Sequence, residues 1–171
     1  MNQVPTAHFT EFIEFFPPLE LPVSLLPDIG QIPTNALPLP GVLLDTYILP
    51  FEGEEVDEFT EYIPYGRIGG NQRFEGIIYW KAGIMQYEFI LATFTRDGLP
   101  ISHAIIGGMR SEEDTILHSV AVIHEDLSIT IAEGTAVSDA SELLRHSNTY
   151  QMRIDSSGII NYDLNEEDKE E

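Results

Sequence analysis

The stretch Tyr87-Glu88-Phe89-Ile90-Leu91-Ala92-Thr93-Phe94 decides the fold of this chain. Apolar residues occupy both alternating sets of positions over most of its length, so a β-strand here presents apolar side chains to both faces of a sheet. We therefore expect a central strand that a second layer covers on one face. The turn residues Arg96-Asp97-Gly98 follow, and Asp-Gly favours a tight hairpin because glycine accepts the positive φ that such turns need.

The same alternation of short β-rich runs and turn residues extends in both directions from this stretch. Runs rich in Ile, Tyr, Phe, Val and Thr, separated by Gly, Asp and Asn, are typical of an antiparallel β-meander. The expected strands are 60–68, 73–80, 85–95, 99–107, 115–123, 127–132, 147–154 and 159–163. The predicted fold class is mainly β: a twisted antiparallel meander or half-open barrel of about seven or eight strands, with a proline-rich N-terminal arm and one short helix.

Glycine pairs follow two of the expected strands, at Gly69-Gly70 and Gly107-Gly108. No helix is expected after either pair, so the helix dipole that would hold a phosphate in a glycine-rich loop is missing. We interpret both pairs as turn glycines. A turn after residue 107 would place His103 opposite His118 on paired strands, with Cβ atoms about 5 Å apart.

The first 59 residues differ in composition from the rest. Ten of the eleven prolines lie before Gly66 and interrupt every apolar run, which forbids long helices and central strands. We predict a short helix over Thr10–Phe16 and extended apolar pieces over Leu19–Leu26 and Val42–Phe51. Residues 1–59 are expected to form an acidic arm that packs on the sheet of residues 60–163.

Two further segments depart from the β pattern. Ser138–His146 is a helical signal within the meander, because Ser138 suits the N-cap and Arg145 suits the last turn. Residues 164–171 are a block of charged side chains that buries nothing, so we expect a disordered acidic tail.

The distribution of charge is strongly asymmetric. The net charge is −21, and the first 66 residues contain eleven Asp and Glu but no Lys or Arg. Such a surface repels phosphates and attracts basic surfaces, so nucleic acid is not expected as a direct ligand. The chain has no cysteine, no leader-like segment and no apolar run long enough to span a membrane. We expect a cytoplasmic protein that binds a basic protein surface and no membrane.

The densest acidic stretch outside the tail surrounds aromatic residues between Phe51 and Tyr62. Acids around exposed aromatic anchors are what an interface with a basic partner requires. We therefore predict a non-enzymatic protein-interaction module of inhibitor, immunity, anti-defence or adaptor type, without a cofactor. The expected partner-binding residues are Glu52, Glu54, Glu55, Asp57, Glu58, Phe59, Glu61 and Tyr62.

Two alternatives stay open. Eight up-and-down strands can close into a barrel that carries an apolar small molecule. The expected pocket aromatics are Phe74, Trp80, Tyr87 and Phe89. The second alternative is a metal-dependent enzyme that uses His103 and His118, although the sequence matches no common metalloprotease or serine-hydrolase motif.

Overall fold

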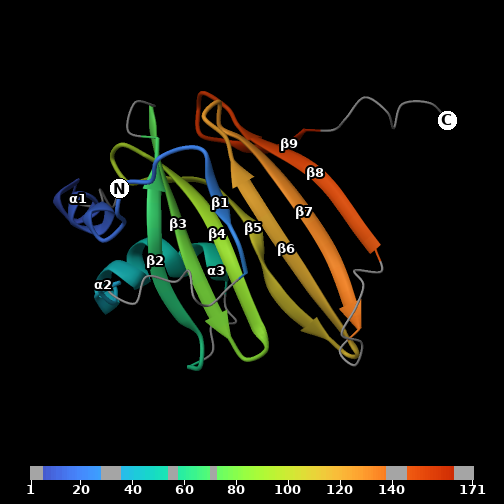
Figure 1. The fold of residues 1–171 in the computed structure, drawn as a ribbon. Coiled ribbons are helices and arrows are strands. Elements are labelled where there is room, and N and C mark those ends of the chain that lie inside the picture. Colours follow the sequence, from blue (N-terminus) through green and yellow to red (C-terminus); the bar gives the residue numbers. More distant parts are fainter. Residues whose placement is uncertain (1–5, 28–35, 54–57, 70–72, 138–145, 164–171) are drawn as a thin grey trace.

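A computed structural model describes residues 6–27, 36–53, 58–69, 73–137 and 146–163 (Figure 1). In these ranges nine strands form one antiparallel sheet in the order β2-β3-β4-β5-β6-β7-β8-β9, while β1 pairs with β6. The strands are β1 (Val23–Leu25), β2 (Glu61–Ile68), β3 (Phe74–Gly83), β4 (Gln86–Thr95), β5 (Pro100–Glu112), β6 (Thr115–Ile123), β7 (Ser128–Val137), β8 (His146–Ile154) and β9 (Ile160–Asp163). No pairing of β2 with β9 occurs among the described residues, so the sheet is not closed. The prediction of a mainly β antiparallel meander or half-open barrel is confirmed.

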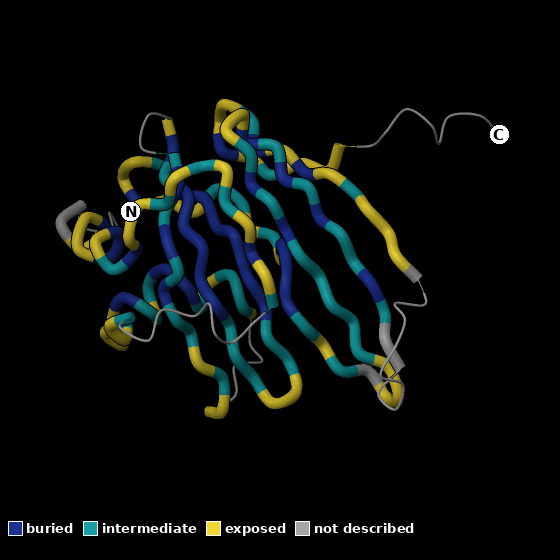
Figure 2. The backbone as a smooth tube through the Cα atoms, viewed as in Figure 1, coloured by how far each residue is buried: buried dark blue, intermediate teal, exposed yellow. Residues whose placement is uncertain are grey.

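The inner face of the sheet carries the larger of two hydrophobic cores. Side chains from β1 to β8 meet there, which requires the sheet to curl until distant strands face one another. The fully buried members with the largest side chains include Phe74, Ile78, Trp80, Phe89 and Leu25. Figure 2 shows that buried backbone concentrates in β3 and β4, the strands whose two faces are both covered.

The outer face of β3 and β4 carries the second core, under a helical layer. The layer consists of α1 (Thr6–Glu14), α2 (Gly41–Leu43), a π-helical turn η2 (Leu44–Ile48) and α3 (Leu49–Glu52). Figure 1 shows these helices gathered at the β2–β4 end of the sheet. Ile90, Ala92 and Phe94 of β4 face this layer, whereas Phe89 and Leu91 belong to the inner core. The central strand expected from its two apolar faces is therefore present.

The prediction of an extended segment over Val42–Phe51 is wrong, because Gly41–Glu52 is helical. Pro40 precedes the first turn and Pro50 lies in the first turn of α3, where a missing N–H removes no helical hydrogen bond. Leu43, Tyr47 and Ile48 are buried at helical spacing against the sheet. The helix expected over Thr10–Phe16 exists but begins four residues earlier, at Thr6, and ends before Pro17.

Gly107 and Gly108 are not turn glycines. They lie within β5, which continues to Glu112, and the register shifts by one residue between Phe89 and Ile90 of the neighbouring strand. Gly108 has φ +137°, and a Cβ built on it would lie 2.0 Å from the carbonyl oxygen of Tyr87. These glycines therefore mark a β-bulge at which the backbones of β4 and β5 approach closely. Glycine within a strand often has this role.

The arm also covers part of the outer edge of β2. Residues Pro17–Leu19 run parallel to this strand: the Leu19 N–H donates to the Arg67 carbonyl and the Arg67 N–H donates to the Pro17 carbonyl, each at 2.9 Å. The Leu19 side chain packs over Gly66, where any Cβ would lie 2.4 Å from the Leu19 Cγ. This pairing shields an edge that would otherwise offer free backbone groups, and it sets where α1 lies relative to β2.

Two predicted segments fall outside the described residues. These are the helix expected over Ser138–His146, apart from its last residue, and the disordered tail expected over 164–171. His146 is the first residue of β8.

Candidate functional site

The structure separates the residues expected to bind a partner into three groups. Glu54, Glu55 and Asp57 lie outside the described residues. Glu58 and Phe59 are exposed in the turn before β2, with 62% of the Phe59 surface accessible, and Glu61 is exposed as the first residue of β2. Tyr62 is half-buried, and its ring lies 6.1 Å from that of Tyr79 at the edge of the outer core.

Glu52, the first of the expected acids, points inward. Its carboxylate accepts a hydrogen bond from the Tyr79 hydroxyl at 2.8 Å and forms an ion pair with Lys81. Only 6% of the Glu52 side chain is exposed. Burial, together with the negative charge of Glu52, raises the pKa of Tyr79, so this hydroxyl keeps its proton and donates. Glu52 therefore joins α3 to β3, and its charge is neutralised within the molecule.

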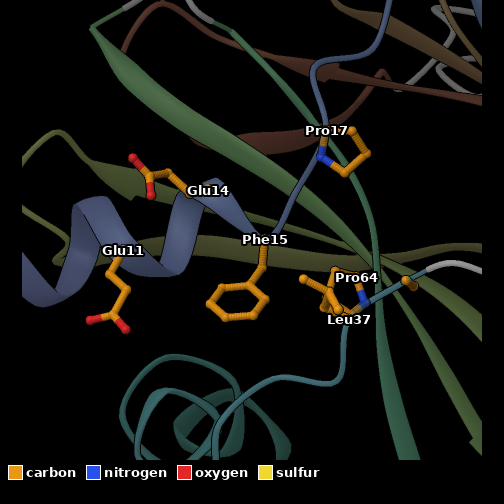
Figure 3. Close-up of a pocket in the computed structure, with 7 residues that line it drawn as sticks. Glu11, Glu14, Phe15, Pro17, Leu37 and Pro64 are labelled. Atoms are coloured by element: carbon orange, nitrogen blue, oxygen red, sulfur yellow. The ribbon is translucent and has the colours of Figure 1, made fainter.

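A hollow between α1 and β2 combines acidic and apolar groups (Figure 3). Its volume is about 560 Å³. The lining residues are Glu11, Glu14, Phe15, Pro17, Ala36, Leu37 and Pro64. We call this site the α1 hollow. Phe15, Leu37 and Pro64 form its apolar part, and Leu37 is 70% exposed.

The amphipathic character of α1 explains why these groups face outward. Phe9, Phe12 and Phe16 are fully buried at helical spacing, and the Phe12 ring stacks on that of Tyr47 at 4.6 Å. Ile13 is buried on the same side, whereas Glu11 and Glu14 occupy the opposite side of the helix. Glu11, Glu14 and the half-buried Phe15 therefore remain at the surface.

Neither carboxylate of the α1 hollow is neutralised by a neighbour within the described chain. No ion pair to Glu11 or Glu14 is formed there, and both side chains are exposed. The first 66 residues contain no Lys or Arg to provide one. The hollow thus presents apolar side chains beside unneutralised negative charge.

The aromatic residues expected to line an apolar ligand pocket fill the interior instead. Phe74, Trp80 and Phe89 are fully buried, and the Trp80 and Phe89 rings meet edge to face at 4.4 Å. Tyr87 is half-buried, stacks on Trp80 at 5.7 Å and lines a separate hollow on the concave side of the sheet. Of the four expected residues, only Tyr87 borders open space in the described structure.

The expected pairing of His103 with His118 is wrong. His103 lies opposite Ala92 of β4, with its ring 4.8 Å from that of Phe51, whereas His118 lies opposite Met109 of β5. The register differs because β5 continues through its glycines and turns only at residues 113–114. Among the described residues, no group of three or more His, Asp and Glu side chains is arranged to hold a metal ion.

No protein-family model, curated protein or solved structure matches this chain. None of the described helices has the length and apolar character needed to cross a membrane. The α1 hollow was not predicted from the sequence. Its signal was the run Glu11-Phe12-Ile13-Glu14-Phe15, in which acids and aromatics alternate on a helix, but Leu37 and Pro64 join it only through long-range packing.

Proposed function

We propose that this protein is a non-enzymatic interaction module whose α1 hollow docks an apolar side chain from a basic segment of another protein. The observation that carries the proposal is the composition of the hollow. Its apolar part is bordered by two exposed carboxylates, Glu11 and Glu14, that no described residue neutralises. Lysine or arginine beside the inserted side chain would complement these charges.

The size of the hollow agrees with an anchor residue. A volume of about 560 Å³ lies within the range of small-ligand pockets, which leaves ample room for an apolar side chain and its neighbours. Interfaces of this type draw most of their energy from a few anchors that fill such pockets, with charged groups at the rim adding orientation and association rate.

Further acidic side chains beside the α1 hollow favour the same kind of partner, a basic protein segment. Exposed Glu58 precedes β2 and exposed Glu61 is its first residue, and β2 supplies Pro64 to the hollow. Together with a net charge of −21, these acids attract a basic surface over about 8 Å at physiological salt. A role for Glu54, Glu55 and Asp57 in the same surface, the cytoplasmic location and the inhibitor or adaptor role remain predictions from the sequence.

A peptide series tests the proposal. Three fluorescent peptides share one length: a central Leu flanked by two Lys on each side, the same peptide with Leu replaced by Ser, and the same peptide with Lys replaced by Glu. We expect saturable anisotropy changes with the Leu peptide. The Ser peptide should bind more weakly, and the peptide with Glu flanks should not bind. Raising the salt concentration from 50 to 500 mM should weaken binding, because exposed charges contribute.

Matched variants locate the binding site. Glu11→Gln/Glu14→Gln and Leu37→Ser should each weaken binding of the Leu peptide. Glu125→Gln/Asp114→Asn removes the same charge from exposed turns away from α1 and should leave the affinity unchanged. The proposal is wrong if the acidic or Ser peptide binds as well as the Leu peptide, if no peptide binds, or if the control variant matches the Glu11/Glu14 variant. Sedimentation showing that a second copy occupies the hollow would also overturn it.

A further inference from the structure

A second hollow lies on the concave side of the curled sheet, and six strands contribute to it. Its volume is about 200 Å³. The lining residues are Tyr87, Glu88, Ile105, Gly107, Gly108, Met109, Arg110, Leu117, Ser119, Glu133, Tyr150 and Tyr162. We call it the tyrosine hollow. Residues of β4 and β9 border one space only because the sheet curls, so the sequence order gives no sign of it.

Two carboxylates border this hollow: Glu88, whose Oε1 accepts a hydrogen bond from the Gln86 side-chain amide at 2.6 Å, and Glu133, which two hydroxyl donors hold in place. Oε1 of Glu133 accepts hydrogen bonds from the Tyr150 hydroxyl at 3.0 Å and from the Ser119 hydroxyl at 3.4 Å. Burial, with a smaller contribution from Glu133, raises the pKa of Tyr150, so this hydroxyl stays protonated as a donor. Oε2 of Glu133 receives no hydrogen bond from any described residue. The Glu133 carboxylate is thus oriented by two donors while one oxygen remains available.

Three aromatic rings accompany this carboxylate. Tyr150 and Tyr162 lie 6.0 Å apart at 37°, and Tyr87 lines the hollow from β4. Tyr162 is 65% exposed, so it forms part of the rim. Aromatic faces attract cations within about 6 Å of the ring centroid, most of all organic ammonium groups whose alkyl surface also packs on the ring.

The backbone of β5 forms part of the wall of the hollow at Gly107 and Gly108. A Cβ on Gly107 would lie 3.3 Å from the Ser119 carbonyl oxygen, and a Cβ on Gly108 would clash with the Tyr87 carbonyl oxygen, so close packing with β4 and β6 favours glycine at both positions. The volume is below the 300–1,000 Å³ usual for drug-sized ligands, so the occupant is small.

We propose that the tyrosine hollow binds a small organic cation of the substituted-ammonium class. Glu133 is the counter-ion, and the rings of Tyr87, Tyr150 and Tyr162 contact the alkyl groups. Arg110 also borders the hollow and is exposed, which makes an anion the competing ligand. The net charge of −21 favours entry of the cation. The proposal is independent of the docking function, because the two hollows share no lining residue.

Nuclear magnetic resonance with three small probes tests this inference. Choline is the cation, 3,3-dimethylbutan-1-ol is its neutral isostere, and acetate is the anion, each added at constant ionic strength. We expect choline to give saturable shifts at the backbone amides of Gly107, Gly108 and Ser119. The neutral isostere should bind at least about tenfold more weakly, since it lacks the charge that Glu133 and the rings recognise.

Two variants and one control make the test specific. Glu133→Gln should weaken choline binding about tenfold or more, and Tyr162→Leu should weaken it about two- to fivefold, the loss expected for one exposed cation–π contact. Glu125→Gln, in an exposed turn, should change nothing. Because Tyr162 is at the surface, its variant tests the site even if Glu133→Gln fails to fold. Equal binding of the neutral isostere, saturable shifts with acetate only, or no saturable shift with choline would each overturn the proposal.

Discussion

The hydroxyl of Thr93 donates a hydrogen bond of 2.6 Å to the carbonyl oxygen of Gly158, across 65 residues of sequence. Thr93 lies in β4, and Gly158 lies in the turn between β8 and β9. Both are buried, and a Cβ on Gly158 would lie 3.0 Å from side-chain atoms of Phe74 and Ile101. This contact joins β4 to the turn between β8 and β9, at the far end of the sheet.

Thr93→Val should destabilise the protein by about 1–3 kcal/mol, because it keeps the shape of the side chain but leaves the buried Gly158 carbonyl without its donor. Urea unfolding measures the change. Thr93→Ser keeps the hydroxyl and loses one methyl group, at a cost of about 1 kcal/mol. Amide exchange near Gly158 separates the two effects, since it should accelerate in the Val variant only. Unchanged exchange in the Val variant would show that this bond does not hold the turn.

Lys81→Met should destabilise the fold by about 1.5–3 kcal/mol, the range for a hydrogen bond to a charged group. The Glu52 carboxylate would remain buried without its cation, although Lys81 itself is 25% exposed, which favours the lower part of the range. The double variant Glu52→Gln/Lys81→Met should recover part of this loss, because no unpaired charge stays buried. Denaturant unfolding of Glu52→Gln, Lys81→Met and the double variant gives the coupling energy. Strictly additive losses would contradict the interaction.

Phe12→Ala should destabilise the protein by about 3–5 kcal/mol, the cost of removing a fully buried aromatic ring. This ring contacts those of Tyr47 and Phe94, so its loss opens a cavity between α1 and the outer face of the sheet. Phe15→Ala removes a half-buried ring from the α1 hollow and should cost about 1 kcal/mol. Thermal unfolding followed by circular dichroism checks both variants. Similar stability of the two variants would mean that α1 does not anchor through Phe12.

Asp155 should contribute stability that depends on pH. Its carboxylate accepts hydrogen bonds from Ser157, Ile159 and Asn161, and the Ser157 hydroxyl is the main cause that lowers the pKa of Asp155 below 3.8. Between the folded and unfolded pKa values the unfolded chain binds more protons, so stability rises with pH in that window. The stabilising contribution of Asp155 is complete above about pH 4, near the pKa of an unfolded Asp. It disappears as the pH falls through the pKa of Asp155 in the folded protein.

Carbon-13 titration of the Asp155 carboxyl group should show a midpoint below 3.8. Asp155→Asn should remove this part of the acid dependence of unfolding, whereas Glu125→Gln should not. An Asp155 midpoint at or above the ordinary value would rule out the stabilising role of the turn.

Much of the sheet was predictable because the alternation of apolar and polar residues within a short run indicates a strand by itself. Tyr87–Phe94 indicated a strand covered on both faces, and the structure places it between two cores. Leu19–Leu26 and Val42–Phe51 show where local patterns were insufficient. The first does contain a strand, β1, whereas the second is helical, because prolines suit first helical turns as well as extended chain.

The candidate sites were harder to predict because their residues meet only through long-range contacts. The acidic character of the arm was evident from composition, yet Glu52 proved to be neutralised by Lys81, 29 residues away. The expected proximity of His103 and His118 depended on where β5 turns, and the bulge at Gly107-Gly108 moved that turn.

By itself, the amino-acid sequence determined the strand pattern, the two-sided burial of the central strand and the excess of negative charge. These properties follow from side-chain polarity at alternating positions and from composition, which no folding event changes. The tertiary structure alone decided how far the sheet curls, which acids remain unneutralised and which side chains border each hollow. Those outcomes depend on contacts between residues far apart in the chain, such as Thr93 with Gly158 and Glu52 with Lys81, whose geometry is set only when the layers pack.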